Sequence, residues 1–318
     1  MDVSIVIPTL GRTSLRALLD ALAAQAPPAG LPEIIVVDDR PQPITPLDTG
    51  PHAKVVNGRG AGPAAARNTG ARAAGGDWVA FLDDDVVPTA NWLAALRRDL
   101  AAAGADVGGV QGRLEVPLPA HRRPTDWERA TAGLAEARWT TADMAYRRAA
   151  LDAVGGFDEG FPRAYREDAD LAYRVRLAGW RLVVGQRRTA HPVRPESRWV
   201  SLRNQRGNAD DARLRRRYGR RWRTLLEVRR GRRHRHAVIA AAGLAALAAP
   251  VLPVPGARLL GAVAAAVWAA GTAEFALARI RPGPRTPDEI LTMAVTSVFI
   301  PPLAVGHWLR GYLGRDRS

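Results

Sequence analysis

The segment Trp78-Val79-Ala80-Phe81-Leu82-Asp83-Asp84-Asp85 decides the fold. Its first five residues are apolar, which is typical of a short strand buried on both faces of a sheet. Three aspartates follow at once, where that strand ends. Ligands of open α/β sheets bind beyond the carboxyl ends of the strands. The segment therefore predicts a binding site at residues 83–85.

Comparable strands are predicted on both sides of this segment, at 3–8, 33–37, 54–56, 107–116 and 182–184. Helices are predicted between several of them, at 14–24, 64–74 and 92–103, and the stretch 142–180 is expected to alternate helix and loop. Alternating strands and helices favour a doubly wound α/β sheet. Because the strand at 33–37 also ends in two aspartates, Asp38 and Asp39, both acidic clusters are expected at one edge of that sheet.

The amino-acid composition excludes several kinds of functional site. The chain has 318 residues, 47% of them hydrophobic, and no cysteine, which excludes disulfides, zinc–thiolate sites and cysteine nucleophiles. The N-terminal residues carry no basic stretch ahead of an apolar one, so they do not resemble a secretory signal. We therefore expect the catalytic part to lie on the cytosolic side.

The formal net charge is +15, and Lys54 is the only lysine, so arginine supplies nearly all of the positive charge. Arginines crowd between residues 194 and 235, directly before the longest apolar stretch. This placement favours contact with lipid headgroups and a cytoplasmic orientation of the segment. The alternatives are a solvated arginine-rich helix and nucleic-acid binding, which would show a steep dependence on salt. We expect no nucleic-acid partner.

Three apolar stretches follow, at 237–252, 257–278 and 290–309. A spanning helix needs about 20 apolar residues, and basic residues flank the first two stretches, so these predict a membrane hairpin with both ends cytoplasmic. The third stretch is expected to be broken by Pro301-Pro302 and to be re-entrant or interfacial. The alternative is a buried helical hairpin of a soluble protein. The expected domains are a catalytic domain at 1–195, an arginine-rich linker with amphipathic helices at 196–236, and a membrane-associated region at 237–318.

Two acidic clusters can carry chemistry. Asp83 and Asp85, two residues apart, can bracket one hard cation such as Mg²⁺ or Mn²⁺, and the alternative is a solvated acidic turn. Glu167 and Asp168 open a helical pattern that ends near Gly179. A carboxylate there can serve as a general base, and it can equally serve as a helix N-terminal cap.

These residues resemble family 2 glycosyltransferases of the GT-A fold, over roughly residues 3–191. The resemblance rests on four blocks in the expected order, each weak alone and strong together. They are Val3-Ser4-Ile5-Val6-Ile7-Pro8-Thr9; Ile34-Ile35-Val36-Val37-Asp38-Asp39; Gly62-Pro63-Ala64-Ala65-Ala66-Arg67-Asn68-Thr69-Gly70 leading to Phe81-Leu82-Asp83-Asp84-Asp85; and Gly155-Gly156-Phe157-Asp158-Glu159 leading to Glu167-Asp168-Ala169-Asp170-Leu171. It implies a GT-A-type mixed sheet, followed here by the C-terminal helical membrane hairpin.

The resemblance also implies roles for individual residues. The catalytic base would be Asp168, and the acceptor would be contacted by Glu167, Asp158 and Phe157. The nucleotide sugar would be bound by Pro8, Thr9, Asp39, Arg67, Asp83 and Asp84, and the Mn²⁺ or Mg²⁺ ion by Asp85, Asp83 and His191. Three alternatives stay open: Asp39 as a turn cap, Arg67 as a salt-bridge partner, and His191 as a structural histidine.

The expected activity is inverting transfer of a single sugar from a nucleoside-diphosphate sugar to a lipid-linked or cell-envelope acceptor at the inner membrane. Processive relatives carry a Gln-x-x-Arg-Trp signature, whereas Arg221-Trp222 lacks the glutamine at that spacing. One rival is a metal-dependent nucleotidyltransferase, which would leave Glu167-Asp168 without a role. The other is a catalytically inactive membrane-bound scaffold or binding protein, which the intact acidic motifs disfavour.

Overall fold

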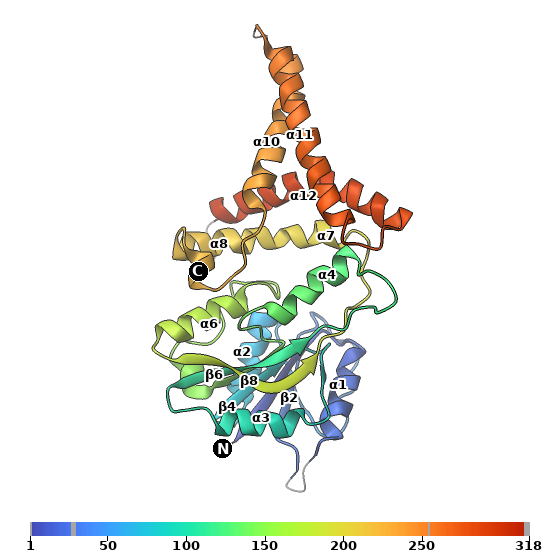
Figure 1. Ribbon diagram of the computed structural model, residues 1–318. Helices are drawn as coiled ribbons and strands as arrows, with labels where there is room; N and C mark the ends of the chain where they lie inside the picture. The colour runs from blue at the N-terminus through green and yellow to red at the C-terminus, as the bar shows by residue number, and fades with distance from the viewer. Residues whose placement is uncertain (1, 27–29, 254, 315–318) are drawn as a thin grey trace.

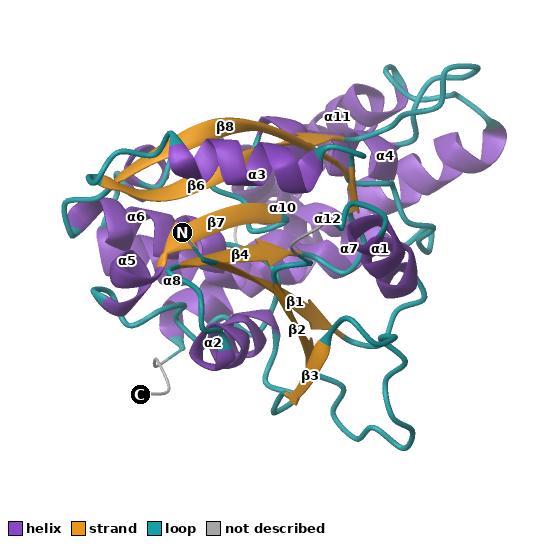
Figure 2. Cartoon of the chain, turned by 90° about the horizontal axis from the view of Figure 1, so that it is seen from below, coloured by secondary structure: helices purple, strands orange, loops and turns teal. Residues whose placement is uncertain are grey.

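The computed structural model describes residues 2–26, 30–253 and 255–314. Strands of this part of the chain form one mixed sheet in the order β3-β2-β1-β4-β7-β6-β8-β5 (Figures 1 and 2). Their bounds are β1 Val3–Thr9, β2 Glu33–Asp38, β3 Lys54–Asn57, β4 Trp78–Leu82, β5 Val87–Pro88, β6 Val107–Glu115, β7 Asp143–Arg147 and β8 Arg181–Ala190. The α/β sheet expected from the sequence is thus confirmed.

One strand was wrongly predicted as helix and loop. β7 lies inside the sheet, antiparallel to both β4 and β6. The strand begins with a polar residue, Asp143, which does not fit the apolar pattern of a buried strand. Asp143 is nevertheless fully buried, because its carboxylate has hydrogen-bond partners. The Asp143 carboxylate accepts hydrogen bonds from Trp92 Nε1 at 2.7 Å, Arg187 Nε at 2.7 Å and Thr189 Oγ1 at 2.5 Å. Buried polar groups persist where such partners exist, and sequence does not show partners this distant.

Helices cover both faces of the sheet. On one face α1 (Ser14–Ala23) and α3 (Trp92–Ala101) pack through leucines and Trp92 against alternate strand residues such as Ile5 and Ile7. On the other face α2 (Pro63–Ala73), α5 (Arg148–Asp152) and α6 (Glu167–Leu177) pack against the intervening residues, Val6 among them. This alternation follows from the two-residue period of a strand, and it leaves the carboxyl ends of β1, β2 and β4 for the site.

A layer of short helices lies between the α/β sheet and the C-terminal helices (Figure 1). Its elements are α4 (Asp126–Ala132), η1 (Gly133–Glu136), α7 (Val200–Arg203), η2 (Asn204–Gly207), α8 (Asn208–Tyr218) and α9 (Trp222–Leu225). A small core of its own joins this layer to α6, through Phe161, Ala169, Leu214, Trp222 and Leu226. In Figure 1, α8 lies between the α/β sheet and the C-terminal helices.

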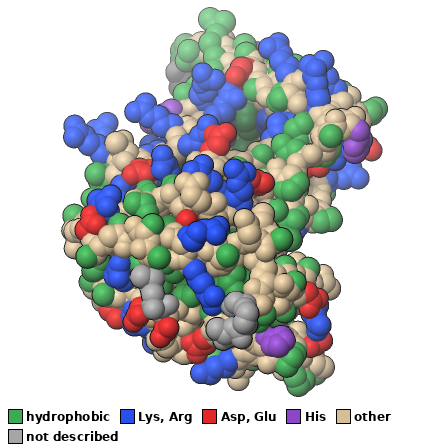
Figure 3. Space-filling view, turned by 60° about the horizontal axis from the view of Figure 1, so that its bottom comes forward, with side chains coloured by type: hydrophobic (Ala, Val, Ile, Leu, Met, Phe, Trp, Pro, Cys, Tyr) green, Lys and Arg blue, Asp and Glu red, His purple; other side chains and the backbone are tan. Residues whose placement is uncertain are grey.

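The C-terminal region holds α10 (Arg233–Ala248), η3 (Ala249–Val251), α11 (Ala257–Ile280) and α12 (Pro287–Leu313). In Figure 1, α10 and α11 project away from the sheet as a hairpin, and α12 runs across its base beside α8. Within the described residues, three helices are long and apolar enough to cross a membrane: Arg233–Val251, Ala257–Ile280 and Pro287–Leu313. Basic side chains are spread over the face shown in Figure 3, with acidic ones among them.

Two expectations for this region need correction. The third apolar stretch is not broken at its prolines, because α12 continues through Pro301 and Pro302. An interior proline costs a helix about 3 kcal/mol, and packing of α12 against α8, α10 and α11 offsets that cost. The hairpin is also not buried in this chain. Only 17% of each apolar window of the first two helices is buried, and Leu244 and Leu247 are exposed.

Candidate active site

The first acidic cluster lies where β4 ends, beside the end of β1. The Asp84 side chain is 1% exposed, and its two oxygens are engaged by Thr9 Oγ1 at 2.6 Å and Arg12 NH1 at 2.5 Å. Thr9 also accepts from the Gly11 amide. Asp84 therefore joins the ends of two neighbouring strands. Thr9 and Asp84, both expected to contact the nucleotide sugar, are here bonded to each other.

Asp83, Asp85 and His191 form a group that could hold a metal ion. One ligand atom from each lies within 4.8 Å of those of the other two, with Asp85 and His191 buried and Asp83 partly exposed. Within the described residues, the buried His191 Nδ1 has no hydrogen-bond partner. Two carboxylates and an imidazole are a donor set that suits Mn²⁺ or Mg²⁺, so the residues fit the predicted ion. Arg194 Nε contacts Asp85 at 2.9 Å and supplies positive charge at the same carboxylate.

Arg67, on α2, connects the Asp83–Asp85 cluster to the carboxylates at the start of α6. Its side chain is 2% exposed, with NH2 at 2.7 Å from Asp83 Oδ1 and NH1 at 2.8 Å from Glu167 Oε1. The guanidinium also lies 5.7 Å from the centre of the Phe157 ring. The salt-bridge role weighed for Arg67 is thus present. The bridge brings the carboxylates at the ends of β4 and at the start of α6 to opposite sides of one cation.

The predicted base lies at the start of α6, behind a strained residue. Arg166 precedes Glu167 and Asp168 with a left-handed backbone (φ 79°), a conformation that costs a non-glycine residue about 1–3 kcal/mol. It is held there by side-chain contacts: Nε donates to Asp211 Oδ1 at 2.8 Å, and NH2 donates to Tyr165 Oη at 2.8 Å. Asp211 belongs to α8, so the helix layer above the site fixes the turn that presents the base.

Burial shifts the acidity of both carboxyl groups. It raises the pKa of Glu167 to about 8, with a further rise from the Asp168 charge and an opposing effect of Arg67. Burial likewise raises the pKa of Asp168, against the lowering effects of the Ala169 amide, Arg67 and Arg166. Raising the pKa of a carboxyl group makes its ionised form a stronger proton acceptor. The pair is therefore suited to general base chemistry.

Asp39 closes a glycine-containing loop. Its Oδ1 accepts from the Gly60 amide at 2.8 Å and its Oδ2 from the Gly62 amide at 3.0 Å. The turn-cap interpretation of Asp39 is thus met by these bonds, which leave lone pairs on both oxygens. Pro8, near the end of β1, lies directly beside Val37 of β2. Pro8, Thr9 and Asp39 accordingly line one end of the sheet, as expected.

The loop 155–160 is held from below by α2. Asn68 Nδ2 donates to the Phe157 carbonyl at 2.9 Å, and the Phe157 amide donates to Asn68 Oδ1 at 2.8 Å. Phe157 is 3% exposed and packs edge-on against Phe81, so it can influence an acceptor only through the shape of the loop. Asp158 pairs with Arg217 at 2.7 Å and Arg213 at 3.2 Å. Of the three residues expected to contact the acceptor, Phe157 is thus a core residue and Asp158 a link to α8, while Glu167 pairs with Arg67.

Several residues of the site escaped sequence reasoning. Arg12, Arg166, Arg194 and Asp211 each neutralise or position an acidic or basic group at the site. Among so many arginines, only Arg194 had a distinguishing signal in the sequence, because it follows His191 by three residues, just beyond β8.

The family model for glycosyl transferase family 2 matches residues 4–171, more than half of the chain. The chain belongs to glycosyltransferase family 2. A pre-mycofactocin glycosyltransferase of Mycobacterium tuberculosis is 34% identical to it over 197 residues, a match that covers 57% of this chain and 40% of the relative. The chain thus corresponds to less than half the length of the curated relative that it matches.

Solved structures agree on the fold of this family 2 glycosyltransferase. A mannosyltransferase from Pyrobaculum calidifontis, in complex with GDP-Man and Mn²⁺, superposes with a TM-score of 0.55 at 18% identity, covering 99% of this chain and 88% of that one. GalNAc-T7 with UDP, GalNAc and Mn²⁺ gives a TM-score of 0.53 at 17% identity, covering 90% and 59%. Both likenesses confirm the GT-A fold expected from the sequence motifs.

Proposed function

We propose that the protein is an inverting, divalent-metal-dependent glycosyltransferase that moves one sugar from a nucleoside-diphosphate sugar to a lipid-linked or cell-envelope acceptor. The observation that carries the proposal is the Arg67 bridge, with Asp83 at 2.7 Å on one side and Glu167 at 2.8 Å on the other. It joins a possible metal group to the helix start that carries the candidate base. The Mn²⁺ complexes of the structural neighbours support the choice of cofactor class.

In the proposed reaction, Asp168 accepts the proton of the acceptor hydroxyl. The acceptor oxygen forms a bond to the anomeric carbon as the bond from that carbon to the nucleoside diphosphate breaks, so the configuration inverts. A cation held by Asp83, Asp85 and His191 would neutralise the diphosphate that leaves. Glu167 and Arg67 keep the base and Asp83 in fixed relative positions. The transition state therefore meets charges that are already in place.

A membrane location follows from the apolar hairpin. Exposed leucines of α10 and α11 favour insertion into lipid. Arginines before α10 and after α11 favour a cytoplasmic catalytic domain at the inner membrane. We propose that α10 and α11 span the bilayer and that α12 lies at its surface, because α12 runs beside α8 at the base of the hairpin (Figure 1).

The deciding experiment is nucleotide release by the detergent-solubilised chain over a panel of nucleotide sugars, with Mn²⁺, Mg²⁺ or EDTA. We expect one donor to be hydrolysed only with metal. Asp85→Ala and Asp168→Asn should each lower the rate at least about 100-fold. Asp48→Ala is the matched control, since its side chain is 84% exposed. Release of sugar 1-phosphate instead of the nucleoside diphosphate would indicate nucleotidyl transfer, and no turnover or binding of any donor would indicate a scaffold.

A further inference from the structure

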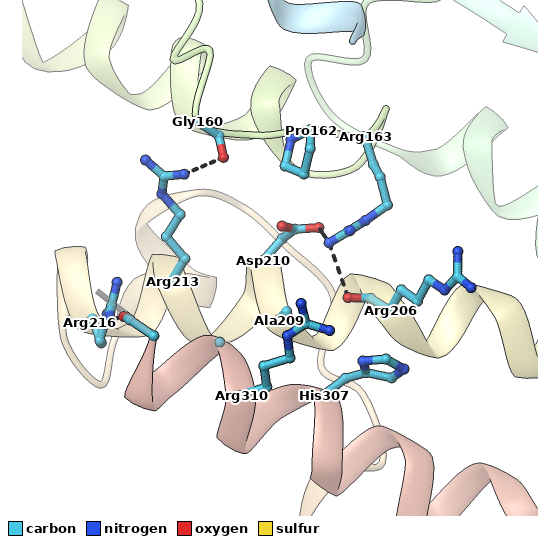
Figure 4. Close-up of a pocket in the computed structure, with 12 residues that line it drawn as sticks. Gly160, Pro162, Arg163, Arg206, Ala209, Asp210, Arg213, Arg216, His307 and Arg310 are labelled. Carbon is cyan, nitrogen blue, oxygen red and sulfur yellow. Dashed lines mark hydrogen bonds and ion pairs between the residues drawn. The ribbon is translucent and has the colours of Figure 1, made fainter. Parts of the chain in front are cut away.

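A cavity of about 450 Å³ lies away from the acidic residues of the candidate active site, between the loop 160–163, the η2–α8 segment and α12. Figure 4 shows the side chains that surround it. Five arginines line the cavity and Asp210 is the one acidic residue among its lining residues; the arginines are Arg163, Arg206, Arg213, Arg216 and Arg310. Three segments far apart in the sequence thus direct positive charge into one space.

Three of the cavity arginines are held by carboxylate and carbonyl groups. Arg163 NH2 donates to Asp210 Oδ2 at 2.6 Å and to the Arg206 carbonyl at 3.2 Å. Arg213 donates to the Gly160 carbonyl and pairs with Asp158 at 3.2 Å, and Arg216 donates to the Gly314 carbonyl. Within the described residues, the exposed side chains of Arg206 and Arg310 make no ion pair.

The floor of the cavity is rigid, because α8 and α12 touch through their backbones. A Cβ atom on Gly311 would lie 2.3 Å from the Ala209 carbonyl oxygen, so these two helices are as close as they can be. Arg310 of α12, and Arg206 of the η2 turn directly before α8, are therefore presented from this fixed pair of helices. A pair of guanidinium groups on a rigid support favours a ligand with several anionic oxygens.

The lining also limits the class of ligand. It contains no phenylalanine, tyrosine or tryptophan, so a nucleobase would find no such ring to stack on. α12 also exposes Leu303 and Leu309, which do not line the cavity, and exposed apolar side chains beside the cavity suit a lipid chain. The opposite wall ends at Arg163, four residues before Glu167. Anionic oxygens beside an apolar helix are the chemistry of a phosphorylated lipid.

We propose that this cavity binds the phosphate or diphosphate group of a membrane lipid, with Arg206 and Arg310 as the principal contacts. The cavity is separate from the acidic residues that are proposed to bind the donor. The proposal rests on the membrane association within the proposed function, but not on sugar transfer.

The test measures binding by calorimetry, with the full chain in an uncharged detergent. The probes are dioctanoyl phosphatidic acid, dioctanoyl glycerol (the same lipid without phosphate) and inorganic pyrophosphate. We expect phosphatidic acid to bind, dioctanoyl glycerol not to bind, and the Arg206→Gln/Arg310→Gln double variant to weaken phosphatidic acid about tenfold or more. The matched control is Arg97→Gln/Arg98→Gln, two exposed arginines of α3 with the same change in charge.

Three outcomes would overturn the proposal. Equal weakening by the α3 control would show bulk charge attraction. Equal binding of dioctanoyl glycerol would show that phosphate is not recognised, and binding of pyrophosphate alone would assign the site to a free anion. Water-dependent hydrolysis of the donor should be unchanged in the double variant. A chain that binds lipid phosphate but hydrolyses no donor would therefore refute the proposed function while leaving this site intact.

Discussion

The acidic site and the arginine layer are two regions with opposite charge arrangements. In the acidic site, formed by Asp83–Asp85, Glu167 and Asp168, carboxylates are in the majority, and Arg67 joins two of them. In the arginine layer around α8, guanidinium groups are in the majority, and Asp210 and Asp211 hold them. The side chain of Arg67 is 2% exposed and those of Asp210 and Asp211 are 7% exposed, so all three are buried at least as deeply as the partners that they join. The comparison indicates that these three buried charges fix the geometry of their regions.

The largest effect is expected for Arg67→Met. The substitution leaves Asp83 and the buried Glu167 without their shared cation, and loss of one partner of a buried ion pair costs about 3–5 kcal/mol. We expect a large fall in thermal midpoint and loss of nucleotide release. Arg72→Met, on the same helix and 63% exposed, is the control. Equal thermal midpoints for the two variants would show that Arg67 does not hold the acidic residues together.

The second largest effect is expected for Asp211→Asn, in the arginine layer. Asp211 accepts from Arg166 at 2.8 Å and from Arg223 at 2.6 Å, and Arg166 holds a left-handed backbone before the base. We expect a stability loss of about 1–3 kcal/mol and a fall in turnover of about tenfold, with little change in the KM for donor. The comparison variant is Glu196→Gln, whose partner Arg203 is half exposed. If Asp211→Asn lowers stability and turnover no more than Glu196→Gln does, α8 does not position the proposed base.

A pH effect comes third. The pKa of Glu167 is raised to about 8 in the folded state, so between its unfolded value, about 4.3, and pH 8 the folded state binds more protons than the unfolded state. The stability contributed by Glu167 is therefore complete at low pH and decreases as pH rises through this window, by at most about 1.4 kcal/mol per pH unit. Thermal midpoints from pH 5 to 9 should decline less in Glu167→Gln than in the parent chain. An identical decline would show that Glu167 stays ionised beside Arg67.

The smallest effect is expected for Arg194→Gln. Arg194 is 39% exposed, so its pair with Asp85 should stabilise the fold by less than about 1 kcal/mol. It competes with a divalent cation for the same carboxylate, and its removal should lower the Mn²⁺ concentration for half-maximal nucleotide release several-fold. A higher Mn²⁺ requirement in the variant would instead make Arg194 part of the donor site.

Local patterns predicted much of the fold. Residues 78–85 showed a buried strand followed by aspartates, because a short apolar run and its polar end are contiguous in sequence. β7 was missed, since Asp143 is compatible with a buried strand only when Trp92, Arg187 and Thr189 are brought to it by folding. The prolines of α12 led to the wrong prediction of a broken helix for the same reason. The contacts that stabilise this helix come from other segments of the chain.

The candidate site was predictable in its residue types but not in its pairings. Asp83, Asp85, His191, Glu167 and Asp168 followed from motif and spacing. That Arg67 joins Asp83 to a glutamate 100 residues away depends on how α2 and α6 pack. Asp158 looked like an acceptor contact because its loop lies near the base, and only the packing of α8 shows its arginine partners.

The α10–α11 hairpin sets a length scale. α11 has 24 residues, and at 1.5 Å per residue it measures about 36 Å, slightly more than the hydrocarbon thickness of a bilayer, about 30 Å. If the hairpin spans the bilayer as proposed, the short connection between α11 and α12 keeps α12 close to the lipid surface. The height of the acidic residues above that surface would then be set by the α8–α12 layer, and an acceptor of the proposed reaction would have to present its hydroxyl at that height. The length of the acceptor's head portion would therefore become a criterion of selection.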